Sequence, residues 1–107
     1  MAKKGLKYKL VRDNIPNIIM EDGKTPITKE LQTDKQKRDA LFKKLQEESI
    51  ELKNAPPKER AEEMADILEV LGAIMLHDNI DSDEVFDIRE NKAKEKGAFV
   101  KFISLGK

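Results

Sequence analysis

The sequence predicts a mainly α-helical fold: a small bundle made of a helical hairpin and a third helix, with short extended segments at both ends. Two observations predict it. The 107 residues are 38% hydrophobic but only 5% aromatic, which suits a small aliphatic core. Apolar residues also recur at three- and four-residue spacing through the middle of the chain. The length fits one domain, divided into an arm (1–33), a helical core (34–96) and a strand-like tail (97–107).

The N-terminal arm combines short apolar runs with turn signals. Residues 8–11 have the composition of a strand. A short helix is expected over 15–20, with Pro16 in its first turn. Residues 25–31 indicate a short extended piece, since a proline within it is typical of an edge or an entry position.

Two long helices follow the arm. The first is predicted over 34–54, with Asp34 as its N-cap. Its leucines recur at the spacing of one helix face, at Leu41, Leu45 and Leu52. A proline pair ends it, and a second amphipathic helix is expected over 58–77. Together the two helices predict a hairpin.

A third helix and a tail complete the chain. The acidic and serine residues at 81–84 are typical of a helix start, and Gly97 is expected to stop this helix after Lys96. The β-branched and aromatic residues of 99–105 indicate a strand that pairs with the N-terminal arm.

Carboxylates occupy two positions where the helical pattern calls for leucine. Glu48 lies between Leu45 and Leu52 on the apolar face of the first helix, and Glu63 is in line with Ile67 on the second. A further carboxylate follows each of them by one turn, at Glu51 and Asp66. Because the helices of a hairpin run antiparallel, these four side chains are expected to converge near its loop end.

Such a cluster requires a cation, because half-buried carboxylates repel one another. Oxygen ligands suit Mg²⁺, with Mn²⁺ as the alternative, and the chain has no cysteine and a single histidine for a softer metal. The competing interpretation is a solvated face on which glutamates fall at four-residue spacing from lysines by chance.

Charge and composition exclude several classes of protein. Twenty-one basic residues balance twenty-one acidic ones, which argues against binding to nucleic acid and weakens the interpretation as a DNA-binding helical module. No apolar run suggests a membrane span or a signal peptide, so we expect no membrane association and a cytoplasmic location.

Two acidic motifs resemble those of a known family. The segments Glu47-Glu48-Ser49-Ile50-Glu51 and Glu63-Met64-Ala65-Asp66 resemble the E-E-x-x-E and E-x-x-D motifs of MazG-type nucleotide pyrophosphohydrolases. Residues 9–16 and 94–99 resemble the opening and closing segments of its phosphoribosyl-ATP pyrophosphohydrolase-like branch. The resemblance implies an all-α bundle completed by dimerisation. It also implies Mg²⁺-dependent hydrolysis of a nucleoside triphosphate to the monophosphate and pyrophosphate, with house-cleaning of aberrant nucleotides as one role.

The resemblance also implies roles for individual residues. The magnesium ligands would be Glu48, Glu51, Glu63 and Asp66. The catalytic pair would be Glu48 and, as an outer group or the base that orients water, Glu47. The substrate phosphates would meet Asn91, Lys92, Lys94 and Lys96, although such residues also complement the dipole at a helix end. The chain departs from the family pattern at Lys96-Gly97-Ala98-Phe99, where relatives tend to have Arg-Gly-Gly-Phe.

A non-enzymatic interpretation remains open: a regulatory or scaffold homodimer whose acidic cluster binds a structural ion. The intact acidic positions favour the enzyme, since a degenerate copy should lose at least one of them. Both interpretations expect a homodimer, because three helices and a short arm bury too little surface to enclose four carboxylates.

Overall fold

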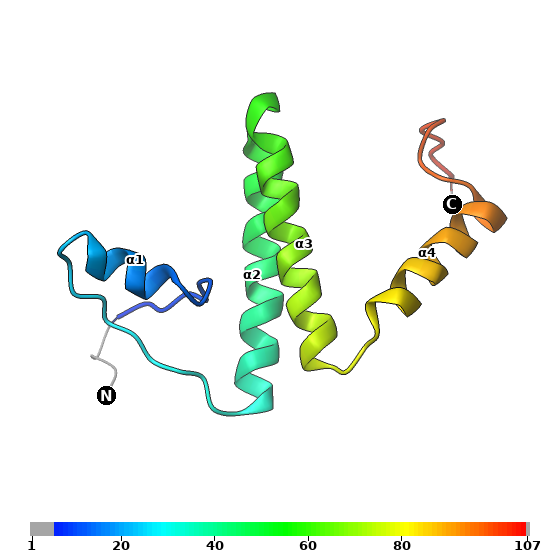
Figure 1. Ribbon diagram of the computed structural model, residues 1–107. Coiled ribbons are helices and arrows are strands. Elements are labelled where there is room, and N and C mark those ends of the chain that lie inside the picture. Colours follow the sequence, from blue (N-terminus) through cyan, green and yellow to red (C-terminus); the bar gives the residue numbers. More distant parts are fainter. Residues whose placement is uncertain (1–5, 107) are drawn as a thin grey trace. The chain divides into compact units, whose positions relative to one another are not determined.

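The computed structural model describes residues 6–106 and is built from helices (Figure 1). In chain order these are α1 (Ile15–Glu21), α2 (Asp34–Asn54), the short 3-10 turn η1 (Pro57–Glu59), α3 (Arg60–His77) and α4 (Ser82–Lys96). The described residues contain no β-strand. The predicted mainly α fold is therefore confirmed, and α2 has the predicted bounds.

The chain divides into two compact units, residues 1–74 and 75–107. The first contains α1, α2, η1 and most of α3. The second contains the end of α3, then α4 and the tail.

A capping box begins α2. The Thr33 side chain accepts a hydrogen bond from the Gln36 backbone N–H at 3.1 Å, and the Gln36 side chain accepts one from the Thr33 N–H at 3.2 Å. The predicted N-cap, Asp34, is wrong by one residue because only Thr33 has a glutamine three positions later to return the bond. Asp34 lies instead in the first turn, where a negative charge favours the helix dipole.

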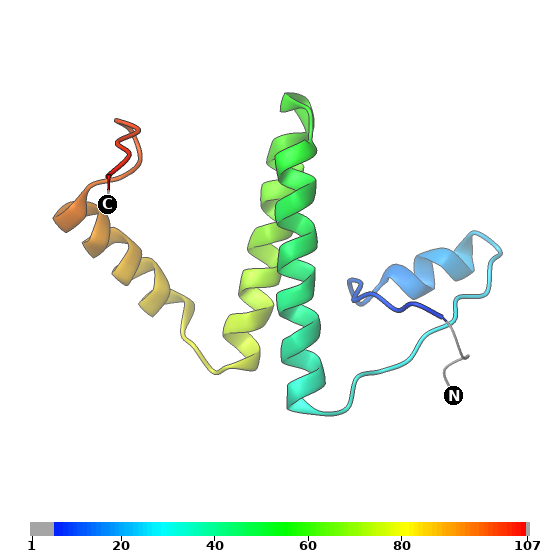
Figure 2. The same cartoon turned by 180° about the vertical axis from the view of Figure 1, so that it is seen from behind.

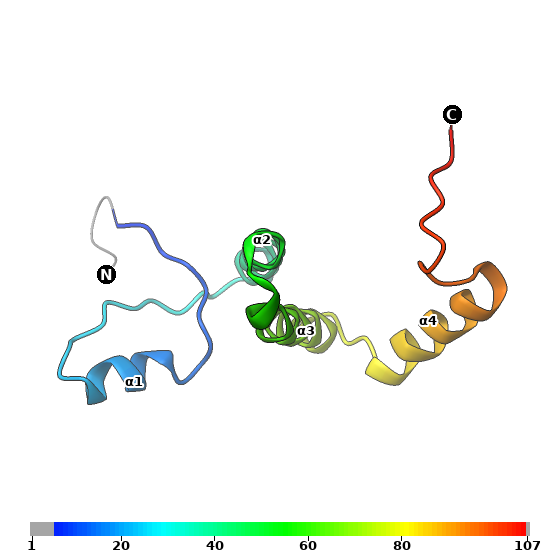
Figure 3. The same cartoon turned by 90° about the horizontal axis from the view of Figure 1, so that it is seen from above.

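The hairpin of α2 and α3 is confirmed, with the two helices side by side (Figures 1, 2 and 3). The chain reverses at Pro56, which is extended, and Pro57, which begins η1. In the described part of the chain only Val70 and Glu48 are buried, at 8% and 5% exposure. Apolar side chains remain on the outside of both helices, including Ile50 at 60% and Leu68 at 63% exposure.

Within the described part of the N-terminal arm α1 is the regular element, and it confirms the predicted short helix. The predicted strand over 8–11 is wrong, since a strand requires a neighbour for its backbone hydrogen bonds and none is formed there. The arm is held by side chains instead. Lys29 Nζ lies 4.5 Å from the centre of the Tyr8 ring, and Arg12 reaches α3.

In the second unit α4 begins and ends where the sequence indicates. The Asp81 side chain accepts a hydrogen bond from the Asp83 N–H at 2.9 Å, and Gly97 ends the helix with a φ of 86°. The predicted strand over 99–105 is wrong, because the described residues offer it no strand to pair with. Its aromatic side chains are exposed, Phe99 at 97% and Phe102 at 89%.

Candidate metal centre

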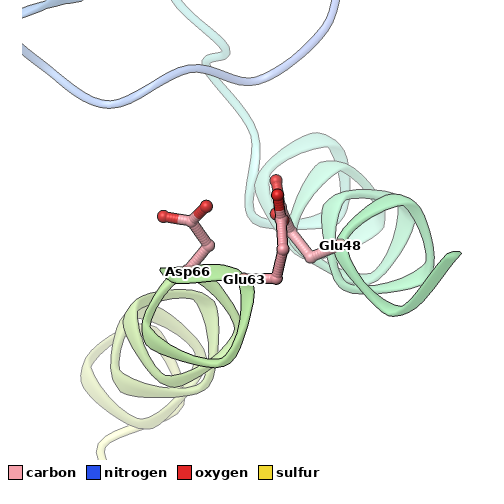
Figure 4. A group of neighbouring side chains, drawn as sticks. All are labelled: Glu48, Glu63 and Asp66. Atoms are coloured by element: carbon pink, nitrogen blue, oxygen red, sulfur yellow. The ribbon is translucent and has the colours of Figure 1, made fainter. Parts of the chain in front are cut away.

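Three carboxylates meet where α2 lies against α3. One ligand atom from each of Glu48, Glu63 and Asp66 lies within 4.8 Å of the others (Figure 4). Glu48 comes from α2, while Glu63 and Asp66 lie one turn apart on α3. The antiparallel hairpin thus brings together three of the four residues predicted as metal ligands.

Glu48 is the buried member of this cluster. Its Oε1 lies 3.3 Å from Lys44 Nζ, whereas its buried Oε2 has no hydrogen-bond partner. Glu63 Oε2 is also buried without a partner. Buried oxygens of this kind are unfavourable unless something satisfies them. Two unpartnered oxygens on adjacent helices, in a set with only oxygen donors, fit a hard divalent cation.

The electrostatics of Glu63 reflect this crowding. Its pKa is raised above the usual value, first by burial and then by the neighbouring carboxylate of Glu51, with further contributions from Asp66 and Glu48. Glu51, the fourth predicted ligand, is therefore close enough to act on Glu63 although it is not one of the three clustered residues. Like charges held this close favour either a proton or a cation between them.

Asp66 has a partner that the sequence did not indicate. Arg12 Nη2 lies 2.8 Å from Asp66 Oδ1, and Arg12 Nη1 lies 3.5 Å from Glu69 Oε1. Helical spacing relates only residues within a few turns, so it carries no signal for a contact across 54 positions. The arm therefore reaches the acidic cluster.

Glu47 shares the Lys44 ammonium with Glu48 and also lies beside the N-terminal arm. Its carboxylate lies 3.6 Å from Lys44 Nζ, and it helps to line a cavity of about 50 Å³ with residues of the arm, among them Tyr8 and Leu10. It is not one of the three clustered carboxylates. Its predicted role beside the ligands stays a prediction.

The predicted phosphate-binding residues lie on α4, in the second compact unit. They are Asn91, Lys92, Lys94 and Lys96, and all four are exposed. Lys94 Nζ lies 3.4 Å from Glu90 Oε1, as expected for residues four apart on a helix. Their role in substrate binding stays a prediction.

Comparison with known protein families assigns the sequence to one of them. The family model for phosphoribosyl-ATP pyrophosphohydrolase matches residues 18–93, more than half of the chain. The chain belongs to this family. The phosphoribosyl-ATP pyrophosphohydrolases are part of the MazG-like all-α superfamily, so at the family level the chain is a pyrophosphohydrolase, a hydrolase. The match includes the acidic cluster and begins after Arg12.

The other comparisons add no relative, since no curated protein and no solved structure matches the chain.

Within the described residues, every helix is too short or too polar to cross a bilayer.

Proposed function

We propose that this protein is a Mg²⁺-dependent nucleoside triphosphate pyrophosphohydrolase, with water attacking the α-phosphorus to give the monophosphate and pyrophosphate. Removal of aberrant nucleotides is its proposed role in a cytoplasmic setting. The observation that carries the proposal is Glu48, a carboxylate at 5% exposure whose Oε2 has no hydrogen-bond partner. Membership of a pyrophosphohydrolase family supports the reaction type.

Side chains from both helices of the hairpin would bind the metal. Lys44 occupies Glu48 Oε1, which leaves Oε2 for an ion, and Glu63 Oε2 is similarly available. Asp66 and Glu51 complete the proposed ligand set. Mg²⁺, or Mn²⁺ in its place, would supply Lewis acidity to the phosphates and an activated water.

The remaining proposed roles belong to residues around the cluster. Glu47 would orient the attacking water together with Glu48, from a position that Lys44 fixes at 3.6 Å. On α4, the substrate phosphates would be bound by Asn91, Lys92, Lys94 and Lys96. Positive charge at the phosphates and accurate placement of water are the main sources of rate in phosphoryl transfer.

The proposed enzyme is a homodimer. Only two residues of the described chain are buried, whereas Ile50, Met64 and Leu68 on the hairpin are 51% to 63% exposed. A second copy packed against these exposed side chains would bury them. A second copy covering the hairpin would also shield the carboxylates from water.

Pyrophosphate release tests the proposal. We would assay the full chain with Mg²⁺ on a panel of standard and modified nucleoside triphosphates, beside Asp66→Asn and a control with EDTA. Release by the wild type with Mg²⁺ only, and not by the variant, is the expected result.

A silent panel from folded, dimeric protein would leave two interpretations: a pyrophosphohydrolase for a nucleotide outside the panel, or a non-enzymatic homodimer with a structural ion. Calorimetric titration with Mg²⁺ and Mn²⁺ then shows whether the acidic cluster binds an ion, and absence of binding would contradict both interpretations.

A further inference from the structure

We infer that Arg12 is a positioning residue for the metal centre: its guanidinium holds the carboxylate of Asp66 in the orientation that binds the ion. The inference rests on the proposed metal-dependent function and extends the site to the N-terminal arm. Arg12 lies outside the part of the chain that matches the family model.

The contact is specific in geometry. Arg12 Nη2 is 2.8 Å from Asp66 Oδ1, the distance of a charge-assisted hydrogen bond. The second amino group, Nη1, is 3.5 Å from Glu69 Oε1, three residues further along α3. One planar guanidinium thus spans two carboxylates one turn apart on α3 and uses a different nitrogen for each.

The same arrangement occurs on the other helix. Lys44 Nζ lies 3.3 Å from Glu48 Oε1 and leaves Oε2 without a partner, and Arg12 engages Asp66 at Oδ1. A basic side chain therefore fixes one oxygen of a carboxylate on each helix and leaves the second oxygen for an ion. Carboxylates that bind metals are commonly hydrogen-bonded in this way, and the outer partner orients the ligand.

Stability alone does not account for the contact. The side chains of Arg12 and Asp66 are 55% and 35% exposed, and ion pairs at such positions add little to folding. The position of the contact is more informative, because Asp66 is one of the three carboxylates whose ligand atoms lie within 4.8 Å of one another.

Two physical effects of Arg12 on metal affinity have opposite signs, which makes the inference decidable. If Arg12 acted only as a nearby positive charge, removing it would strengthen cation binding. If it orients Asp66, removing it should weaken binding, and loss of an outer partner typically costs about 10- to 100-fold in metal affinity.

The experiment is a calorimetric titration of the full chain with Mn²⁺, without nucleotide, for the wild type, Arg12→Gln and Arg12→Lys. The control is Lys7→Gln, which removes the same charge from an exposed position of the arm. We expect Arg12→Gln to raise the dissociation constant for Mn²⁺ by about 10-fold or more. The dissociation constant of Arg12→Lys should lie between those of Arg12→Gln and the wild type, and that of Lys7→Gln should equal the wild-type value. Thermal unfolding in EDTA checks that each variant is folded. If Arg12→Gln does not fold, Arg12→Lys is compared with the wild type in its place.

If the wild type binds Mn²⁺ and releases pyrophosphate but the Arg12 variants bind Mn²⁺ as tightly or more tightly, the inference is overturned and the proposed function stands. A wild type that does neither would overturn the proposed function and the role of Arg12 with it. An equal loss in Lys7→Gln would also overturn the inference, because the weaker binding would then not depend on the contact between Arg12 and Asp66.

Discussion

Replacing Glu48 by leucine should make the metal-free protein more stable while removing metal binding. Glu48 is 5% exposed and lies between Leu45 and Leu52 on its own helix, so a leucine fits the apolar pattern of that face. The change removes a buried charge and its unpartnered Oε2. Lys44 keeps a partner in Glu47, 3.6 Å away, and its side chain is 19% exposed.

The expected gain follows from the cost of burying the charge. Replacing buried ionic groups by well-packed apolar ones stabilises proteins by about 1–4 kcal/mol in favourable cases. We expect the lower part of that range, about 1–2 kcal/mol, because the contact with Lys44 is lost. For a domain of this size each kcal/mol raises the Tm by roughly 4–8 °C, so the expected increase is roughly 4–16 °C.

Thermal unfolding in EDTA measures this change at a fixed protein concentration, since the Tm of a dimer depends on concentration. Gln46→Leu is the matched control: it introduces the same side chain at an exposed position of α2, where the effect should stay within about 0.5 kcal/mol. Mn²⁺ should raise the Tm of the wild type and of the control but not that of Glu48→Leu.

A Glu48→Leu protein that is less stable than the wild type in EDTA would refute this reasoning. The carboxylate would then stabilise the hairpin through Lys44, and its burial would have no connection with a metal.

The remaining predictions concern the cluster, the helix start and the dimer. Glu63→Gln should abolish Mg²⁺-dependent pyrophosphate release yet stabilise the metal-free fold because repulsion is relieved, whereas the exposed Glu62→Gln should change neither activity nor Tm. The pKa of Glu63 is raised above the ordinary 4.5, chiefly by burial, so above that pH the folded chain binds more protons than the unfolded chain. Metal-free stability should therefore fall as the pH rises through the raised pKa, and urea titrations should show a flatter pH dependence for Glu63→Gln. Thr33→Ala should cost about 1 kcal/mol by removing the capping box, measured by urea unfolding. Leu68→Asp places a charge on an exposed apolar side chain of α3, and sedimentation should show it shifting a dimer towards monomer; an unchanged dimer would exclude this face as the interface.

Local sequence determined the helices of this protein. The spacing of the leucines, the proline pair at the reversal and Gly97 after α4 each act within a few residues, so α2 has the predicted bounds and α4 ends where expected. The N-cap prediction was wrong because Asp34 is a favourable capping residue by itself, whereas Thr33 also forms reciprocal hydrogen bonds with Gln36.

The predicted strands failed for a different reason. Composition over 8–11 and 99–105 favours extended backbone, but a strand exists only where a second strand satisfies its hydrogen bonds. Whether such a partner is present is not a local property of the sequence.

The sequence determined one part of the acidic cluster, and the tertiary structure determined the other. Glutamates in leucine positions predicted that Glu48 and Glu63 would face one another, because helical periodicity and an antiparallel hairpin together fix which residues meet. Only the tertiary structure decided that Lys44 engages one oxygen of Glu48 and leaves the other unpartnered, and that Arg12 reaches Asp66. The physical reason is range: periodicity relates residues within a few turns, whereas a contact across 54 positions depends on the path of the arm in space.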